Sequence, residues 1–448
     1  MKKLLLLCLV LLGGVMQISA TDYYVSGDKR ILPYSDADWG IREQNKMHAT
    51  SVANVYALVV TKSVASGTDY LFKFVEKDGN TEHWYGYDGG DGNTTLNFTY
   101  GTTYTIIFYY NASTHKGRFI VTPMLRWDLG DSGNGNWTWC YEDASMLTRD
   151  GDFSWTMEIT PAKFTKDTSF RIYSAAWDKS AYPNGQDIAV TYGGASVNSA
   201  YFNYTASTDW SWKISKPSYT FEKVVITATY KPFNDDDFGQ WEVSADAYIT
   251  KEVSKDNQYA TLGCSVPLEI VEANGVTAHP LTANASTGII TKGDAISVIP
   301  SNEGALLENL TGNDKTIRAK VLADDPSVKP SNQLVAFTGT GKLTQPTTGE
   351  KTYYILTKKN DNVGFYKVNT TSGNSMGANT AYLEVDGAIT LARDFFVLEG
   401  ETTGIANLNV NDNANFNADA PMYNLAGQRV GKNYKGVVIV NGKKMILK

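Results

Sequence analysis

Apolar and polar residues alternate in short runs along most of the chain. Thr, Val, Tyr and Phe dominate these runs, and Gly, Asn and Asp separate them, as in strands joined by tight turns. The clearest runs are 56–61, 70–76, 103–110, 153–159, 223–230, 352–358 and 436–442. We expect a β-strand at each of them.

Helical patterning is absent from the same stretches. No segment keeps a helical period over about eleven residues, which is the signal of an amphipathic helix. Many short strands separated by turns are typical of sandwiches and barrels. A chain of 448 residues is also long enough for about three domains. The sequence therefore predicts an all-β, multidomain protein.

Tryptophan is unevenly distributed. All ten tryptophans lie between Trp39 and Trp241, so we place a domain boundary at about 243. Before that boundary, the segments around 23–40 and 70–74 can be aligned with 125–139 and 169–173. An imperfect repeat at a spacing of about a hundred residues indicates two tandem copies of one domain rather than a solenoid.

The N-terminal residues 1–20 have the pattern of a secretory signal peptide. Two lysines precede an apolar run from Leu4 to Val15, and Ala20 is a small residue suited to cleavage. Cys8 lies inside the apolar run rather than just after it, which argues against lipidation. No later stretch approaches the ~20 apolar residues that a spanning helix needs. We expect an exported protein without a transmembrane segment.

The net charge and the positions of histidine and cysteine exclude some classes of function. A net charge of −7 argues against a nucleic-acid partner, which would require a basic surface. The four histidines show no zinc-ligand spacing to each other or to cysteine. We expect no metal and no cofactor. Cys140 and Cys264 follow the signal peptide, and the sequence leaves open whether they pair or remain isolated thiols.

No catalytic motif is present. The chain lacks the G-x-S-x-G, H-E-x-x-H and P-loop patterns. Two carboxylates can cleave a glycosidic bond, and the close pairs in Trp-rich loops are Asp36 with Asp38 and Glu142 with Asp143. We expect no enzyme, and a glycoside hydrolase is the weaker alternative. The run at 88–93 lacks the full calcium-loop pattern, and turn chemistry explains its Asp and Gly residues equally well.

Paired tryptophans could either form a flat surface for a sugar ring or fill the core of a sandwich. Trp137 and Trp139 are two residues apart on an expected strand, so their rings face one side about 6.5–7 Å apart. Such a pair suits the apolar face of a sugar ring, and it suits a sandwich core as well. Because 153–157 and 209–213 repeat the pairing, most of these rings must belong to cores.

Aromatic residues in polar, loop-like surroundings are the better binding candidates, because a loop ring is less easily buried. These candidates are Trp84, Tyr85, Tyr87 and Trp177. Lys73 lies between apolar neighbours and should point outward, where it would either be solvated or donate hydrogen bonds to sugar hydroxyls.

The first part of the chain resembles a family of carbohydrate-binding modules. The order Gly-Asp, polar turn, Trp, Met, Phe-Lys-Phe and Trp is similar to the tandem starch-binding β-sandwiches of outer-membrane glycan-utilisation proteins in Bacteroidetes. The resemblance implies two immunoglobulin-like sandwiches that hold a helical glucan on aromatic rings without cleaving it. The chain differs in lacking a lipoprotein Cys and in the short first loop of its second copy.

The middle part resembles a β-rich domain common in secreted Bacteroidetes proteins. Six segments carry this resemblance in order: 255–270, 274–282, 298–309, 353–368, 379–385 and 398–405. The resemblance implies no particular chemistry.

The C-terminal segment 422–448 resembles the sorting domain of the type IX secretion system. Asn441-Gly442 is the strongest short hairpin signal, because Gly accepts positive φ at the turn. The resemblance implies recognition by the outer-membrane secretion machinery and a small sandwich-type fold. The matching residues are Tyr423, Asn424, Leu425, Gly427, Gln428, Arg429, Lys435, Gly436, Asn441, Gly442, Lys443 and Lys444.

These observations combine into one hypothesis. We expect a secreted or surface-attached, non-catalytic protein that binds a polysaccharide or host glycan; the alternative is a structural or adhesive surface protein without a small ligand. The expected parts are a signal peptide (1–20), two β-sandwiches (21–123 and 124–243), a β-rich domain (244–405), and a linker with sorting domain (406–448).

Overall fold

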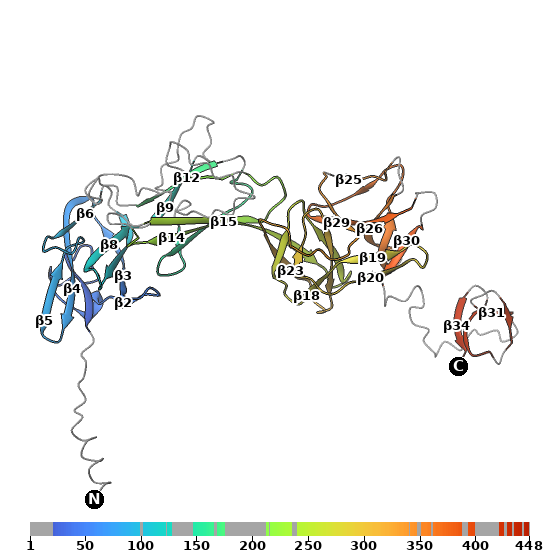
Figure 1. The fold of residues 1–448 in the computed structure, drawn as a ribbon, viewed down its shortest axis with the longest axis horizontal. Helices are drawn as coiled ribbons and strands as arrows, with labels where there is room; N and C mark the ends of the chain where they lie inside the picture. Colours follow the sequence, from blue (N-terminus) through green and yellow to red (C-terminus); the bar gives the residue numbers. More distant parts are fainter. Residues whose placement is uncertain are drawn as a thin grey trace, which may run out of the picture. The chain divides into compact units, whose positions relative to one another are not determined.

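The protein is all-β, as the sequence predicts (Figure 1). The computed structural model describes residues 21–98, 102–121, 123–127, 147–164, 168–174, 212–214, 216–234, 240–339, 341–346, 351–359, 362–387, 393–398, 421–424, 428–431, 434–440 and 443–447. Within these ranges the one helical element is a short 3-10 turn, Glu43–Asn45. No helix in the same ranges is long and apolar enough to cross a membrane.

The chain divides into two compact units, Met1–Ile249 and Thr250–Lys448. The division falls inside one long strand, β15 (Gln240–Val253), a few residues after the position at which tryptophan disappears from the sequence. The finer domain boundaries and the internal repeat stay predictions, since much of the expected second copy lies outside the described residues.

The first unit begins with a β-sandwich made of two four-stranded sheets. In the first sheet, β4 lies between β1 and β5 and also pairs with β6. The second sheet has the order β2-β3-β7-β8. The strands of the first sheet are β1 (Asp22–Gly27), β4 (Gly67–Asp78), β5 (Thr81–Tyr85) and β6 (Thr94–Phe98). Those of the second are β2 (His48–Ala49), β3 (Val55–Val64), β7 (Thr102–Asn111) and β8 (Lys116–Val121).

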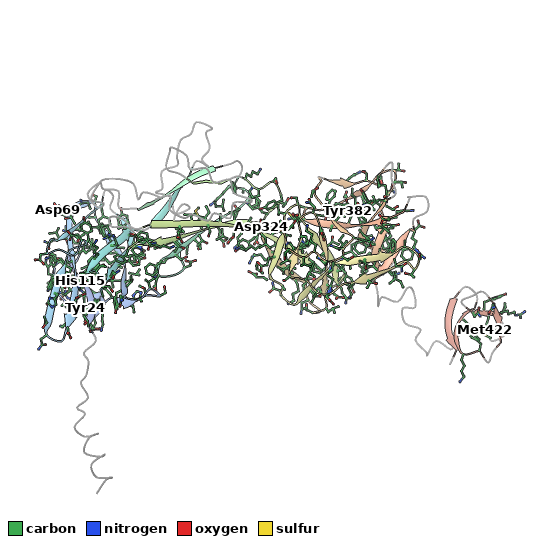
Figure 2. The ribbon with its side chains drawn as sticks, viewed as in Figure 1. Tyr24, Asp69, His115, Asp324, Tyr382 and Met422 are labelled. Atoms are coloured by element: carbon green, nitrogen blue, oxygen red, sulfur yellow. The ribbon has the colours of Figure 1, made fainter. Side chains whose placement is uncertain are left out.

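Period-two alternation builds the core between these two sheets. Phe72 and Phe74 of β4 are fully buried, and they pack with Phe108 and Tyr110 of β7 in one cluster. Figure 2 draws the side chains of the described residues on the ribbon. The Phe72 ring meets the Phe108 ring edge-on, with centroids 4.9 Å apart, a favourable geometry for aromatic pairs. The residues between them on β4 therefore face away from the core.

Tyrosines gather around the carboxylate of Glu76 in this sandwich. The Tyr23 and Tyr56 rings stack with centroids 3.9 Å apart. Tyr110 donates its hydroxyl hydrogen to Glu76 Oε1 at 2.9 Å, and the His115 Nδ1 atom lies 3.1 Å from the same oxygen. Burial, followed by the neighbouring Tyr56 and Glu76, raises the pKa of Tyr23 to about 12.

The remainder of the first unit contains further antiparallel strands. Three of them form a sheet of order β13-β12-β9, and β10, β11 and β14 lead to β15 in another. Tyr109, on the outer side of β7, is buried against this second group. Its ring stacks on Phe153 at 5.2 Å, and its hydroxyl donates to the Asp152 carbonyl at 2.7 Å. The strands are β9 (Pro123–Trp127), β10 (Thr148–Arg149), β11 (Ser154–Ile159), β12 (Thr168–Ser174), β13 (Trp212–Ile214) and β14 (Lys223–Lys231).

The second unit is built on a seven-stranded sheet of order β19-β20-β30-β27-β26-β29-β24 and a three-stranded sheet of order β16-β22-β18. Tyr354, Phe365, Leu383 and Phe396 form much of its buried core. The strands of these two sheets are β16 (Tyr259–Gly263), β18 (Val276–His279), β19 (Leu281–Asn284), β20 (Ile289–Lys292), β22 (Gly304–Asn309), β24 (Leu334–Phe337), β26 (Lys351–Lys359), β27 (Asn362–Lys367), β29 (Thr380–Asp386) and β30 (Phe395–Leu398).

Shorter strands complete this unit. A small hairpin pairs β25 with β28, and β17, β21 and β23 belong to the sheet that includes β15. These strands are β17 (Leu268–Glu272), β21 (Val298–Ile299), β23 (Lys315–Val321), β25 (Lys342–Leu343) and β28 (Asn374–Ser375).

The C-terminal residues form a separate four-stranded sheet of order β32-β31-β33-β34. Its strands are β31 (Met422–Asn424), β32 (Arg429–Val430), β33 (Gly436–Val440) and β34 (Lys443–Leu447). Val440 is directly opposite Lys443, so β33 and β34 form the predicted hairpin with a two-residue connection. That connection, Asn441 and Gly442, lies outside the described residues, as do Leu425 and Gly427.

The alternating runs of the sequence correspond to real strands in every case. They became β3, β4, β7, β11, β14, β26 and β33. The structure extends most of them by a residue or more at one or both ends. It ends the last one at Val440 rather than at residue 442, because Lys443 already belongs to the next strand.

Gly117 lies where β8 presses against the core, and a side chain there should be costly. A Cβ atom at this position would be 1.8 Å from Cε2 of Phe74. We expect Gly117→Ala to lower the free energy of unfolding in urea by about 1–3 kcal/mol, the usual cost of overpacking. Gly92→Ala is the control, because a Cβ there meets nothing within 4 Å. Equal stability of the two variants would contradict the packing described for β8.

Tyr23 should make the sandwich sensitive to alkali. Its pKa is about 12 in the folded chain and about 10 in an unfolded chain. The folded state favours the protonated Tyr23 hydroxyl. The stability that this preference contributes is complete below pH 10 and is lost as the pH rises towards 12. We expect Tyr23→Phe to flatten this decline in urea unfolding measured from pH 9 to 11.5, with Tyr423→Phe as the exposed control. Parallel declines in wild type and Tyr23→Phe would refute the assignment.

Candidate functional site

The outer face of the first sheet, meaning the side of β1, β4 and β5 turned away from the core, carries the candidate site. Trp84 of β5 is directly opposite Val75 of β4, and Lys73 of β4 is opposite Ser26 of β1. Because cross-strand partners share a face and Phe72 and Phe74 point inward, all four side chains lie on the outer face. Lys73 thus points outward, as the sequence predicts.

Two tryptophan rings meet on this outer face. Trp39 reaches it from the segment 28–45, which connects β1 to the 3-10 turn and β2. The Trp39 and Trp84 ring centroids are 6.3 Å apart, and the ring planes make an angle of 52°. Trp39 is 37% exposed and Trp84 is partly exposed. Rings from distant parts of the sequence therefore form one accessible aromatic pair.

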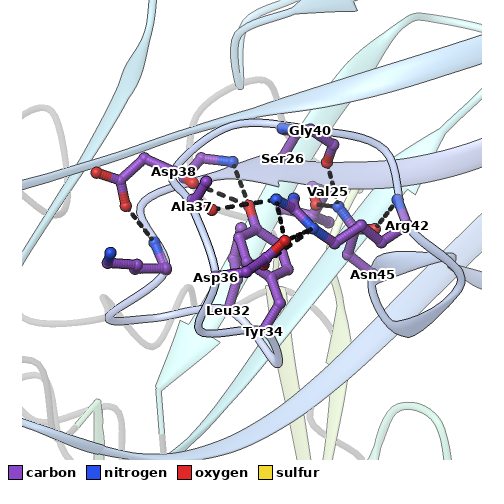
Figure 3. Close-up of polar contacts among 12 residues, drawn as sticks. Val25, Ser26, Leu32, Tyr34, Asp36, Ala37, Asp38, Gly40, Arg42 and Asn45 are labelled. Carbon is purple, nitrogen blue, oxygen red and sulfur yellow. Dashed lines mark hydrogen bonds and ion pairs between the residues drawn. The ribbon is translucent and has the colours of Figure 1, made fainter.

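Hydrogen bonds to β1 and around Tyr34 hold the segment 28–45 (Figure 3). The Trp39 amide donates to the Gly27 carbonyl at 2.8 Å, and the Gly40 amide donates to Ser26 Oγ at 2.7 Å. The buried Tyr34 hydroxyl donates to the Gly27 carbonyl at 2.9 Å. The segment is thus attached to the sheet on both sides of Trp39.

The carboxylates near Trp39 are engaged in local contacts. Asp36 pairs with Arg42, with Nε and Oδ1 3.2 Å apart, and Asp38 Oδ1 accepts the Lys29 amide at 3.0 Å. Both carboxylates are therefore part of the hydrogen-bond network of the segment 28–45. The other expected pair, Glu142 and Asp143, lies outside the described residues.

An Asp–Arg pair begins the same segment. Arg30 contacts both carboxylate oxygens of Asp28 through Nε, each at 2.9 Å. Burial by itself would raise the pKa of Asp28, but the hydrogen bonds from Arg30 bring it below its usual value. Asp28 therefore stays ionised, and its Oδ1 also accepts the Arg30 amide at 2.8 Å.

Lys73 and the glycine-rich turn 86–93 border the outer face. Lys73 Nζ donates to the Asp91 carbonyl. Within the turn, the Gly90 amide donates to Asp88 Oδ1 at 3.0 Å, which is ordinary turn chemistry for Asp. In the ranges that the structure describes, no group of three or more His, Cys, Asp or Glu side chains is placed to hold a metal ion.

The structure separates the candidates that are neighbours in the sequence. Trp84 and Tyr85 are adjacent on β5, so they point to opposite faces. Tyr85 packs against the core cluster, and its ring stacks on His115 with centroids 4.8 Å apart. Tyr87 is half-buried in the following turn, where its carbonyl accepts the Gly117 amide at 2.8 Å. Of these three, Trp84 belongs to the aromatic pair.

Other tryptophans have different outcomes. Trp137, Trp139 and Trp177 lie outside the described residues, so their roles as glycan-binding candidates stay predictions. Trp155 is 1% exposed and Phe153 is 9% exposed, so this pair is core. The sequence reasoning did not select Trp39, although Trp39 stands between Asp38 and Gly40, the same kind of polar, turn-like setting that singled out Trp84.

Comparison with known proteins gives little further information. No protein-family model matches the chain, and no curated protein matches it. Among solved structures, the chain is similar to SusF from Bacteroides thetaiotaomicron, with 10% identity and a TM-score of 0.24 over 67% of this chain and 72% of that chain. A likeness this low carries no argument about fold or function, so the site is argued from its own residues.

Removing single tryptophans should distinguish the exposed pair from the core. Trp155→Ala should lower the free energy of unfolding by roughly 3–5 kcal/mol, because the ring is fully packed. Trp39→Ala should lower it by clearly less, about 1–2 kcal/mol, because Trp39 is already 37% exposed in the folded chain. Urea unfolding of the two variants beside wild type measures both. A Trp39→Ala variant as unstable as Trp155→Ala would mean that Trp39 is part of the core.

Proposed function

We propose that this protein is a secreted, surface-destined, non-catalytic glycan-binding protein. The observation that carries the proposal is the Trp39–Trp84 pair, two accessible indole rings brought together on one face of a sheet. Sugar rings present apolar C–H groups on one side, and these groups pack well against aromatic faces. A paired platform of this kind suits two successive sugar units.

Lys73 supports this use of the outer face. An ammonium group has three hydrogens to donate, and the Asp91 carbonyl takes one of them. Among the described residues, the remaining hydrogens have no such acceptor and would meet sugar hydroxyls. Ring stacking together with a few hydrogen bonds is the usual composition of a small-ligand site.

The angle between the rings bears on the shape of the ligand. Planes tilted by 52° cannot both lie flat against an extended ribbon-like chain. They suit a polysaccharide whose successive sugars turn relative to one another. The resemblance of residues 21–243 to starch-binding modules agrees with such a chain. Affinity at one site would be weak, and a second site in the same chain would raise it by avidity.

Export is the second part of the proposal. The signal-peptide pattern of residues 1–20 would direct the chain across the inner membrane. The C-terminal sheet of β31–β34, with its hairpin at Val440 and Lys443, would be recognised by the type IX secretion machinery. Together these segments support a location outside the cell or on its surface.

The second candidate function is a structural or adhesive surface protein without a small ligand. The observation in its favour is the extent of aromatic burial: Trp155, Tyr109 and Tyr230 are all core residues. Under this alternative, the Trp39–Trp84 pair would be an incidental surface feature.

Affinity electrophoresis of the mature chain, residues 21–448, in gels containing soluble starch, mannan, cellulose derivatives or mucin tests the proposal. We expect retardation by at least one polysaccharide, and a fall in affinity of about tenfold for Trp39→Ala and for Trp84→Ala. Tenfold corresponds to about 1.4 kcal/mol, within the range of a ring contact.

Phe395→Ala is the matched control, because Phe395 is an exposed aromatic residue of the second unit and its loss should leave retardation unchanged. Melting temperatures measured in parallel exclude unfolding as the cause. The absence of retardation on every polysaccharide would favour the structural alternative. Retardation that is unaffected by either Trp variant would mean that the glycan binds at a site other than the Trp39–Trp84 pair.

A further inference from the structure

Trp39 occupies an unusual backbone conformation. Its φ is 54°, in the left-handed region that bulky L-residues avoid for steric reasons. A residue stays in that region only when its surroundings hold it there, and such positions concentrate at functional sites. The structure must therefore contain contacts that keep Trp39 in place.

Burial anchors the segment 28–45 through Ile31, Leu32 and Tyr34, which belong to the core cluster, but it does not reach Trp39. All five residues from Ser35 to Trp39 are exposed. Next to Trp39 the main chain is held by hydrogen bonds, and these converge on Gly40, the residue that follows Trp39. Ser26 Oγ accepts the Gly40 amide at 2.7 Å, and Asn45 Nδ2 donates to the Gly40 carbonyl at 2.8 Å.

Asn45 connects the segment to the sheet. It is fully buried, and its Nδ2 also donates to the Val25 carbonyl of β1 at 2.6 Å. Its Oδ1 accepts the Arg42 amide at 2.6 Å. The side-chain amide of Asn45 thus acts as both donor and acceptor. It bridges β1 to the main chain on the C-terminal side of Trp39 (Figure 3).

Arg42 lies under the same turn. Its guanidinium is placed over the Tyr34 ring, 4.0 Å from the centroid, and it pairs with Asp36. A Cβ added to Gly40 would come within 2.7 Å of Arg42 Nη1, so the turn and the guanidinium are in close contact. The Arg42 side chain therefore packs directly against the turn that carries Trp39.

We propose that Ser26 and Asn45 are positioning residues that set the Trp39 ring at its angle to Trp84 before a ligand arrives. This inference rests on the proposed glycan-binding function of the outer face. Ordering a loop on binding reduces affinity, and a loop that is already ordered avoids that loss. The two residues act through the main chain of Gly40 and do not themselves need to touch the ligand.

The test uses the mature chain labelled with 5-fluorotryptophan. Trp39→Phe removes one signal from the fluorine NMR spectrum and thereby assigns the Trp39 resonance. Ser26→Ala deletes the acceptor of the Gly40 amide with almost no change in volume. We expect it to shift or broaden the Trp39 resonance and to weaken binding of soluble starch, used as the probe, about 3- to 10-fold, in a chain that still melts cooperatively.

Ser63→Ala is the matched control, because Ser63 bonds Thr103 Oγ1 at 2.8 Å on an exposed strand pair of the same sandwich. It should leave both the Trp39 resonance and the affinity unchanged. Ser26→Cys, which keeps a side-chain acceptor but a weaker and larger one, is the second variant if Ser26→Ala lowers the melting temperature. It should shift the resonance in the same direction.

An unchanged Trp39 resonance in both Ser26 variants would overturn the positioning role. A shifted resonance with unchanged affinity in a wild type that binds would overturn its link to binding. A wild type that binds none of the polysaccharides, soluble starch included, would overturn the proposed function instead. The resonance would then still decide whether Ser26 orients Trp39, so the two failures can be told apart.

Discussion

Strand β4 sets the geometry of the first sandwich, because its alternating side chains divide between the side that faces the sandwich core and the outer side of the sheet. Phe72 and Phe74 fill the space between the two sheets, and this fixes Lys73 and Val75 on the other side. The antiparallel registers with β1 and β5 then place Ser26 and Trp84 beside them. A shift of one residue in the register between β4 and β5 would move Trp84 to the core side and its neighbour Tyr85 to the outer side.

The outer face depends equally on a segment that is not part of any sheet. Ile31 and Leu32 anchor residues 28–45 in the core. The residues around Trp39 are exposed, and hydrogen bonds of Ser26, Tyr34 and Asn45 hold that part of the segment. Buried polar side chains of this kind are favourable only when fully satisfied, and Asn45 meets that condition through its bonds to Val25, Gly40 and Arg42. This network joins the loop around Trp39 to strand β1 of the first sheet.

Aromatic residues serve two opposed purposes in the first unit. Tyr109 and Trp155 contribute large apolar area to buried contacts, and the hydroxyl of Tyr109 still finds a carbonyl acceptor. Trp39 and Trp84 instead leave ring surface accessible. The high tryptophan content of this part of the chain is therefore the sum of a packing requirement and a surface feature, and composition alone does not separate the two.

Local pattern was enough to predict part of this protein from its sequence. Alternation identified the strands that became β3, β4, β7, β11, β14, β26 and β33, and the Asn-Gly signal identified the C-terminal hairpin. These features depend on residues that are close in the chain, so they can be predicted from the sequence directly. The outward direction of Lys73 followed from the same local reasoning.

The candidate site was only half predictable. Trp84 was identified by its polar surroundings, but Tyr85 was given the same standing, because alternation reveals two faces without revealing which one is covered. Trp39 entered the site through a contact between residues distant in sequence, which no local pattern encodes. By itself, the sequence determined where strands form and which side chains share a face. The tertiary structure decided which faces are buried and which rings meet, because burial depends on elements that arrive from elsewhere in the chain.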